Sequence, residues 1–147
     1  MRMKMIEQIY ISWQDFHQHA KQLAQKLKTI REFNKIIAIS RGGLIPAGII
    51  AYELDIRNTQ AINISSYDGE EQRKAENVVI KADIDDVDEK TLIIDDLSDT
   101  GKTFQLVRQL FPQAYLASVY AKPTGTKYVD MHAVAVPDKW LVFPWDI

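Results

Sequence analysis

Apolar runs of strand length alternate with stretches of helical periodicity along this chain. The runs lie at residues 8–11, 35–39, 61–65, 77–81, 115–121 and 131–136, with one more that starts at residue 92. Helices are expected over residues 12–27, 44–51 and 103–110. Because strands that are apolar on both faces are typical of parallel sheets, the pattern predicts an α/β fold with a mainly parallel central sheet flanked by helices.

Each predicted helix has a face that we expect to be buried. In the first helix Ser12 is the expected N-cap, with Asp15 three residues later. Its apolar face consists of Phe16, Ala20, Leu23, Ala24 and Leu27. The inward residues of the third helix are expected to be Phe104, Val107 and Leu110. Among glutamines and lysines of the first helix, His17 and His19 are expected to face solvent, without a third ligand for a metal.

Residues 92–103 form the stretch around which the chain is organised. The strand passes two adjacent carboxylates, Asp95 and Asp96, and ends in a polar loop that opens a helix. Residues 100–103 supply backbone N–H groups, hydroxyls and an ammonium at a helix N-terminus, which favours a phosphate. The carboxylates would repel a phosphate, so a sugar diol or a hydrated Mg²⁺ suits them better. Together these groups predict a site for a phosphorylated ribose; the alternative is an Asp-rich helix cap without a ligand.

A second glycine loop, Ser40-Arg41-Gly42-Gly43, joins the strand at residues 35–39 to the helix at 44–51. Two glycines allow a ligand to approach the backbone closely, and Arg41 adds a fixed positive charge. Taken alone, the loop is equally compatible with a tight βα turn that carries a surface arginine.

Composition narrows the class of protein. The 147 residues, 46% hydrophobic and 26% charged, predict one globular domain over residues 1–147. The net charge of −2 gives no basic footprint for nucleic acid. No apolar run reaches the length of a membrane span, and the charged N-terminus has no hydrophobic region after it, so we expect a cytoplasmic protein without an integral membrane segment.

Three other segments are polar or unusual. Residues 67–74 combine turn formers and charges without apolar periodicity, which predicts a loop. Acidic residues at 83–89 do not follow the order of ligands in an EF-hand, and we interpret them as an exposed turn. Residues 140–147 are rich in aromatic residues, and such a tail is expected to dock on the core or at an interface between subunits.

Residues 93–103 resemble the ribose-5-phosphate signature of the type I phosphoribosyltransferases, in which two acids precede Asp-Thr-Gly-x-Thr. Further matches lie at residues 39–43, at 65–67 with Arg73, at 121–123, and at Trp140 with 144–146. Together they resemble the bacterial xanthine-guanine branch of this family. The resemblance implies a parallel sheet with a small hood formed by a loop and the C-terminal tail. It also implies a reaction in which a 6-oxopurine and 5-phosphoribosyl 1-pyrophosphate (PRPP) give a nucleoside monophosphate and pyrophosphate, with Mg²⁺.

The resemblance also assigns roles to individual residues. The ribose-5-phosphate would be bound by Asp95, Asp96, Leu97, Ser98, Asp99, Thr100, Gly101, Lys102 and Thr103. PRPP and its pyrophosphate would be bound by Arg41, Gly42 and Arg73. The purine would contact Asp99, Lys122, Trp140, Leu141 and Asp146, with Asp99 as the catalytic residue near N7 and Asp96 as the Mg²⁺ ligand. The loop that holds Arg73 would close over the reaction centre, and a strained or cis non-proline peptide is expected within residues 40–42.

The base would be selected by Lys122 and Trp140. A lysine has only donors, so it pairs with a 6-oxo group and leaves a 6-amino group unmatched. The ring of Trp140 would stack on the purine. This sequence departs from the xanthine-guanine pattern at Lys102, where glycine is usual, at Leu141, where isoleucine is usual, and in ending at residue 147.

Several alternatives stay open from the sequence. A regulatory protein can keep this fold and bind nucleotide or RNA without useful catalysis. A second alternative is a phosphoribosyltransferase for a pyrimidine or orotate, and a third is a metal-binding or interaction module built on the acidic residues. Guanine, xanthine and hypoxanthine are not ranked. The family resemblance implies a homo-oligomer, either a tetramer or a dimer.

Overall fold

The structure is a computed structural model that describes residues 7–66, 78–80 and 84–146. Its elements in chain order are β1 (Gln8–Tyr10), α1 (Trp13–Lys28), β2 (Lys35–Ser40), α2 (Leu44–Leu54), β3 (Thr59–Ser66), β4 (Val78–Ile80), β5 (Thr91–Ser98), α3 (Lys102–Leu110), β6 (Tyr115–Ala121), the 3-10 helix η3 (Thr126–Tyr128), β7 (Met131–Ala135) and β8 (Trp140–Val142). The predicted strands and helices are confirmed, with small differences at their ends.

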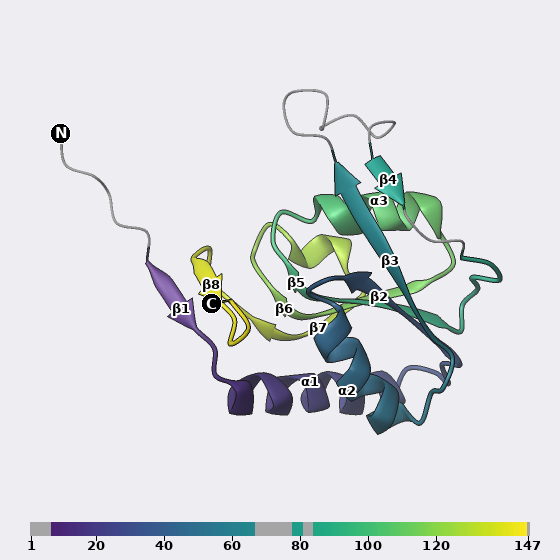
Figure 1. Cartoon of the computed structure of the whole chain (residues 1–147), viewed down its shortest axis with the longest axis horizontal. Helices are drawn as coiled ribbons and strands as arrows, with labels where there is room; N and C mark the ends of the chain where they lie inside the picture. The colour runs from purple at the N-terminus through teal and green to yellow at the C-terminus, as the bar shows by residue number, and fades with distance from the viewer. Residues whose placement is uncertain (1–6, 67–77, 81–83, 147) are drawn as a thin grey trace.

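The central sheet has the strand order β4-β3-β2-β5-β6-β7. Every pair in it is parallel except β3 and β4, which are antiparallel. In Figure 1, α1 and α2 lie below this sheet and α3 lies above it, so helices cover both faces. The predicted α/β fold with a mainly parallel sheet is therefore confirmed.

The core is divided by the sheet into two apolar clusters. The larger one joins α1 and α2 to the sheet and includes the five expected residues of the α1 face, all fully buried. The smaller one lies under α3 and contains Phe104 and Val107. The expectation that Leu110 is also inward was wrong, because the helix ends there, Leu110 is 44% exposed, and Phe111 packs against the cluster instead.

The predicted N-cap of α1 is confirmed, whereas only one of its two histidines faces solvent as predicted. The side chain of Ser12 accepts a hydrogen bond from the backbone N–H of Asp15 at 3.0 Å, which confirms the N-cap. His17 is exposed as expected. His19 is half-buried, with Nδ1 2.7 Å from the hydroxyl oxygen of Tyr120, so the expectation of a solvated side chain was wrong there. The reason is its position one turn from Phe16, on the flank of the buried face.

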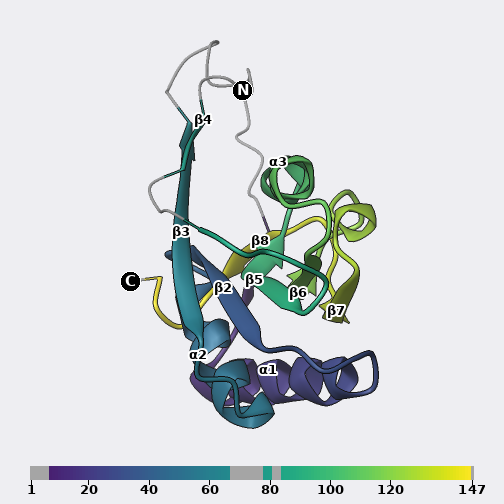
Figure 2. The same cartoon turned by 90° about the vertical axis from the view of Figure 1, so that its right-hand side faces the viewer.

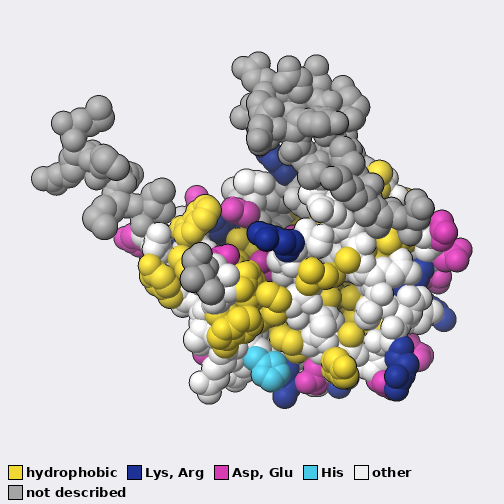
Figure 3. Space-filling model, in the orientation of Figure 1, with side chains coloured by type: hydrophobic (Ala, Val, Ile, Leu, Met, Phe, Trp, Pro, Cys, Tyr) yellow, Lys and Arg dark blue, Asp and Glu magenta, His cyan; other side chains and the backbone are white. Residues whose placement is uncertain are grey.

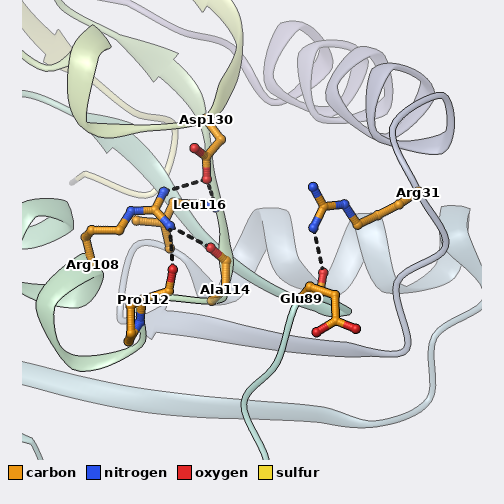
Figure 4. A network of polar contacts seen from close by, with 7 residues as sticks. All are labelled: Arg31, Glu89, Arg108, Pro112, Ala114, Leu116 and Asp130. Carbon is orange, nitrogen blue, oxygen red and sulfur yellow. Dashed lines mark hydrogen bonds and ion pairs between the residues drawn. The ribbon is translucent and has the colours of Figure 1, made fainter.

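Polar contacts fix the end of α3 that lies away from the polar loop. Figure 4 shows Arg108, in the last turn of α3, donating to the carbonyl oxygen of Ala114 at 2.8 Å and pairing with Asp130 at 2.6 Å. The same figure shows Arg31 donating to the carbonyl oxygen of Glu89 at 3.0 Å, which ties the loop after α1 to the turn before β5. These contacts hold α3 and β5 in place, and with them the loop that connects the two elements.

The acidic turn before β5 is organised around a buried cation. Asp85 and Asp86 are exposed, which agrees with the predicted turn, whereas Asp83 lies outside the described residues. Lys35, only 7% exposed, donates from Nζ to the backbone carbonyls of Asp85 and Asp86 at 2.7 and 2.9 Å. The turn thereby covers the amino-terminal end of β2, which is the end of the strand opposite to the Arg41 loop.

A second sheet of two strands stands beside the central one. β1 and β8 pair in parallel, with Gln8 opposite Trp140, so the C-terminal tail pairs with the start of the chain. The sequence resemblance implied a hood made by the tail and a loop; the tail part pairs with β1, and most of that loop, at residues 67–77, lies outside the described residues. No helix in the described part of the chain is long and apolar enough to cross a membrane.

Candidate active site

A cavity of about 640 Å³ opens at the carboxyl ends of β2 and β5. This is the edge at which ligands bind in open α/β sheets. The residues around the cavity are Ile39, Ser40, Arg41, Gly42, Ile45, Ile64, Asp95, Asp96, Thr103, Trp145 and Asp146. Six of the predicted site residues are thus brought to one place: Arg41, Gly42, Asp95, Asp96, Thr103 and Asp146.

Two adjacent carboxylates form the acidic side of the cavity. Asp95 accepts a hydrogen bond at Oδ1 from the backbone N–H of Asp96 at 2.8 Å. Burial raises the pKa of Asp95 well above its usual value, and the charge of Asp96 raises it further. Burial also raises the pKa of Asp96. Among the described residues no cation pairs with either carboxylate, so this side of the cavity suits a positively charged or hydroxyl-rich ligand.

The loop after β2 approaches the carboxylates closely. The peptide bond between Ser40 and Arg41 is cis, which confirms the prediction for residues 40–42. A Cβ on Gly42 would lie 2.4 Å from Oδ2 of Asp96, and a Cβ on Gly43 would lie 2.4 Å from the carbonyl oxygen of Ile94. Side chains at these two positions would therefore push the loop away from β5. Arg41 is exposed at the edge of the cavity, with its charge available to an anion.

The loop after β5 presents the amino-terminal end of α3. Gly101 is the N-cap residue of α3 and has a φ of +87°, in the left-handed region that favours glycine. A Cβ on it would also collide with the ring of Tyr128, 1.9 Å away. The hydroxyl of Thr100 accepts from the backbone N–H of Lys102 at 3.4 Å. Lys102 and Thr103 are exposed in the first turn, where free N–H groups and the helix dipole favour a phosphate.

Lys122 and Asp99 form an ion pair where β6 ends. Lys122 is only 5% exposed, and its Nζ lies 3.3 Å from Oδ1 of Asp99, whose side chain is 51% exposed. The two loops that hold these residues are tied together by backbone and hydroxyl contacts. Ser98 donates from Oγ to the carbonyl oxygen of Gly125 at 2.8 Å, and the N–H of Lys122 donates to the carbonyl oxygen of Ser98 at 3.0 Å. Thr124 donates to the carbonyl oxygen of Asp99 at 2.9 Å.

The remaining predicted residues lie in different surroundings. Trp140 is 58% exposed on β8, and no aromatic or cation–π contact joins it to another described residue. Leu141 is buried in the larger core cluster, and Leu97 packs half-buried against the same cluster. Asp146 accepts at Oδ2 from the backbone N–H of Phe143 at 2.9 Å. Arg73 lies outside the described residues.

Known proteins are similar to this chain in sequence. The profile of the family described as "Phosphoribosyl transferase domain" matches residues 5–147. The chain is 48% identical over 137 residues to the xanthine-guanine phosphoribosyltransferase of Desulfotalea psychrophila, covering 92% of this chain and 84% of that protein. It is 45% identical over 137 residues to the xanthine-guanine phosphoribosyltransferase of Nitratidesulfovibrio vulgaris strain Hildenborough, covering 92% and 83%. The chain belongs to the type I phosphoribosyltransferases.

Solved structures of phosphoribosyltransferases have the same fold. A purine phosphoribosyltransferase from Pyrococcus horikoshii superposes with a TM-score of 0.81 at 31% identity, and the match covers 95% of each chain. A xanthine-guanine-hypoxanthine phosphoribosyltransferase from Helicobacter pylori has a TM-score of 0.79 at 18% identity, with 97% and 95% covered, which supports the fold alone. This phosphoribosyltransferase is an enzyme by membership of its family.

Three features of the phosphoribosyltransferase site were missed from the sequence. Trp145 was expected only to pack, and it does stack on Phe143 with centroids 4.8 Å apart, but it also borders the cavity. Tyr128 lies under Gly101, and Gly125 lies against the carbonyl oxygen of Ser98. The only sequence signal for the last two contacts is the pair of glycines, because the partners are more than twenty residues apart in the chain.

Proposed function

We propose that this enzyme transfers the 5-phosphoribosyl group of PRPP to the 6-oxopurines guanine and xanthine, with hypoxanthine as a further substrate, in a Mg²⁺-dependent reaction of purine salvage. The products are the nucleoside 5′-monophosphate and pyrophosphate. The observation that carries this proposal is the buried Lys122 paired with the half-exposed Asp99 at the edge of the sheet. The names of the relatives, all xanthine-guanine phosphoribosyltransferases, support the same class of base.

Lys122 would recognise the 6-position of the base. A buried ammonium carries three donors and no acceptor, so it pairs with an oxo group and leaves an amino group without a partner. Because Lys122 is buried directly after β6, it cannot turn into solvent to avoid that mismatch without breaking its ion pair with Asp99. Sites of this kind reject an analogue that lacks the matching polar group far more strongly than they reject a change of size.

Asp99 would act on the imidazole side of the purine. As N9 attacks C1′ of the ribose, the proton on N7 passes to the carboxylate of Asp99, and the bond from C1′ to the pyrophosphate oxygen breaks with its electron pair on pyrophosphate. The half-exposed position of Asp99 beside Lys122 leaves one side of its carboxylate open to a base. Trp140 would stack on the purine, and the backbone near Leu141 and Asp146 would contact the 2-substituent.

The carboxylates of Asp95 and Asp96 would face the ribose. Positive charge develops at the ribosyl group as the bond to pyrophosphate breaks, and two unpaired carboxylates in a shielded position stabilise it. Their oxygens also fit the ribose hydroxyls and a hydrated Mg²⁺, which prefers oxygen ligands. When bound, Mg²⁺ would neutralise charge on the departing pyrophosphate.

The residues present fit such an ion without forming a closed cage. In the described part of the chain no group of three or more His, Asp or Glu side chains converges on a metal position. Mg²⁺ usually takes one or two carboxylates and completes its shell with water and phosphate oxygens. Asp96, whose carboxylate lies against Gly42, is the ligand that we propose.

Two anion sites flank the carboxylates. Arg41 and the backbone at Gly42 would bind pyrophosphate, together with Arg73 from the segment outside the described residues. The backbone and side chains of residues 98–103 would bind the 5′-phosphate at the start of α3, with Lys102 adding a charge where xanthine-guanine enzymes carry glycine. In this proposal N–H groups and cations bind the phosphate groups, and carboxylates bind the ribose.

We further propose one domain over residues 1–147, a cytoplasmic location, and a homo-oligomer, either a dimer or a tetramer, without a nucleic-acid partner. The mixed charge supports the last point: basic and acidic side chains are interspersed on the face that Figure 3 shows, and the whole chain carries a net charge of −2.

A panel of bases tests the proposal. The protein is incubated with Mg²⁺ and PRPP, one base at a time, and pyrophosphate release is followed with guanine, xanthine, hypoxanthine, adenine, uracil and orotate. Turnover confined to the three 6-oxopurines is the expected result. Turnover with uracil or orotate would keep the ribose-phosphate site and overturn the base assignment. A folded protein that binds PRPP and turns over none of the bases would instead be a regulatory protein on this fold.

A further inference from the structure

The ring of Tyr128 lies against the backbone of the loop that opens α3. The three atoms nearest to the place of a Cβ on Gly101 are Cδ2, Cε2 and Cγ of that ring. Because Gly101 is the N-cap residue of α3, the contact is made where this loop becomes a helix. Figure 1 and Figure 2 both show the 3-10 helix η3, drawn in yellow-green and ending at Tyr128, beside α3. Tyr128 is not among the described residues that border the cavity, so it supports the loop from behind.

The ring of Tyr128 is itself held in place. Tyr128 is half-buried and packs against the smaller apolar cluster, which also contains Phe104 of α3. Its backbone N–H donates to the carbonyl oxygen of Gly125 at 3.2 Å, and Nζ of Lys127 lies 5.1 Å from its ring centroid. A side chain that is fixed by packing on one face can hold a functional loop on the other.

The lysine of the proposed base site is fixed independently of this ring. The carbonyl oxygen of Lys122 accepts a hydrogen bond from the backbone N–H of Gly125 at 2.9 Å, and the N–H of Lys122 donates to Ser98 at 3.0 Å. These bonds do not pass through the side chain of Tyr128. Loss of the ring is therefore expected to release the backbone at Gly101 and to leave Lys122 where it is.

We infer that Tyr128 is a positioning residue for the 5′-phosphate of PRPP, acting through Gly101. Gly101 has a φ of +87°, which a glycine adopts easily, but the same freedom lets a glycine leave that conformation. The ring of Tyr128 occupies the space beside Gly101 and limits this freedom, so the N–H groups in the first turn of α3 stay aligned for the phosphate. A loop that is ordered before binding loses less entropy when the ligand arrives. The inference rests on the phosphate site of the proposed function and is independent of the base.

The affinity for PRPP tests this role without any turnover. Calorimetry with PRPP and Mg²⁺, in the absence of a base, should give a Kd about tenfold higher for Tyr128→Ala than for the wild type, a loss of about 1.4 kcal/mol. Tyr128→Phe keeps the ring and should bind PRPP as the wild type does. The ratio of kcat/KM for guanine to that for adenine should be the same in all three proteins, because Lys122 keeps its bonds.

A second tyrosine supplies the matched control. Tyr115, at the other end of β6, is also half-buried, and its ring lies 5.5 Å from that of Phe33. Tyr115→Ala removes the same ring from a place away from the loop and should leave the Kd for PRPP unchanged. Circular dichroism checks the fold of each variant, and Tyr128→Leu, which should also raise the Kd, replaces Tyr128→Ala if the latter is unfolded. An unchanged Kd in the folded Tyr128 variant, an equal rise in Tyr115→Ala, or an equal rise in Tyr128→Phe would each overturn the inference.

A double-mutant cycle tests whether Tyr128 acts through Gly101. In Gly101→Ala the new Cβ meets the ring, and Tyr128→Ala removes the ring that it meets. The rise in Kd for the double variant should therefore be smaller than the product of the two single rises, as for residues in direct contact. A rise equal to that product would mean that the two residues act separately, and the inference would be wrong.

The inference and the proposed function can fail separately. A wild-type protein that binds PRPP but turns over none of the bases would contradict the proposed reaction, and the ranking of the Tyr128 variants by Kd would still support the inference. A wild-type protein that turns over the 6-oxopurines, with one Kd for PRPP in all these variants, would support the proposed reaction and overturn the inference.

Discussion

The site has two acidic regions, and in the part of the chain that the structure describes only one of them contains a cation. Where β6 ends, Asp99 has a cation beside it, because the Nζ of Lys122 lies 3.3 Å away. At the end of β5, Asp95 and Asp96 lie side by side, and none of the described residues pairs a cation with them. In the proposed function the first region is complete in the free protein, and the second would be completed by the bound substrate and Mg²⁺.

Under the proposed function, this difference distinguishes the part of the site that is built in advance from the part that a ligand would complete. In the proposed function a base offers weak and neutral contacts, so its partner groups would have to be held rigidly. The hydrogen bonds from Ser98 and Thr124 tie together the loops that carry Lys122 and Asp99. PRPP and Mg²⁺ would bring strong charges of their own to the proposed ribose site, so the carboxylates could stay unpaired until these ligands bind. Burial raises the pKa of both carboxylates, so keeping them ionised in a shielded position costs stability in the free protein.

The largest expected effect is on turnover, from a substitution of Asp99 in the Asp99–Lys122 ion pair. Asp99→Ala should lower the turnover with the preferred 6-oxopurine by about 10²–10⁴-fold, the range for a general acid–base group. The fold should survive because the side chain is half-exposed. Turnover is measured by pyrophosphate release under saturating PRPP, with Asp99→Asn as the variant of equal size. A turnover in Asp99→Ala equal to that of the wild type would remove Asp99 from the chemistry.

A smaller effect, on the choice of base, is expected from a substitution of Lys122, the partner of Asp99. Lys122→Ala removes a charged hydrogen bond worth about 1.5–3 kcal/mol, so kcat/KM for guanine should fall by about 10–100-fold. The value for adenine should not fall, because adenine gains nothing from a donor at the 6-position. The preference for guanine over adenine should therefore shrink by the same factor.

An exposed lysine nearby supplies the control for that measurement. Lys127→Ala removes a cation from the same connection between β6 and β7, one that packs over the ring of Tyr128, with Nζ 5.1 Å from the ring centroid. It should leave the ratio of guanine to adenine unchanged. If the two lysine variants change that ratio equally, Lys122 does not select the base.

Features that depend on a local pattern could be predicted from the sequence, and contacts between distant residues could not. The buried strands and Asp95 and Asp96 could be predicted, because a run of apolar residues followed by acids is a local pattern. The pairing of β1 with β8 could not, since two strands of three residues each leave no periodicity and meet from opposite ends of the chain. The contact of Gly101 with Tyr128 was equally hidden, because it joins two loops through a single ring.

Two glycines, Gly101 and Gly48, are expected to respond differently to substitution by alanine. Gly101→Ala places a Cβ where φ is +87° and where the ring of Tyr128 lies 1.9 Å away, so the loop must shift. A left-handed backbone costs an ordinary residue about 1–2 kcal/mol, and we expect the KM for PRPP to rise about tenfold. Gly48→Ala, in a helix with open space around it, should instead stabilise the fold by about 0.5–1 kcal/mol and leave that KM nearly unchanged. Equal KM values in the two variants would contradict the role of Gly101.

The smallest expected effect is on the stability of the fold, through the carboxylate of Asp95. The pKa of Asp95 is raised above the ordinary value of 3.8 in the folded chain, mainly by burial. Above the raised pKa the carboxylate is ionised in both states, and the folded state carries the whole cost of shielding it. As the pH falls through the raised pKa, the folded protein binds a proton that the unfolded chain does not yet bind, so this residue's contribution to stability improves until the pH approaches 3.8.

Asp95→Asn removes that cost and keeps an oxygen that can accept from the N–H of Asp96. We therefore expect its Tm near neutral pH to exceed that of the wild type by about 2–4 °C, the shift that 1 kcal/mol gives in a domain of this size. The difference should narrow as the pH is lowered, and addition of Mg²⁺ with PRPP should raise the Tm of the wild type more than that of the variant. A variant that is less stable than the wild type at neutral pH, in thermal melts followed by circular dichroism, would mean that Asp95 is already compensated in the free protein. The contrast between the proposed base site, built in advance, and the proposed ribose site, completed by its ligands, would then not hold for Asp95.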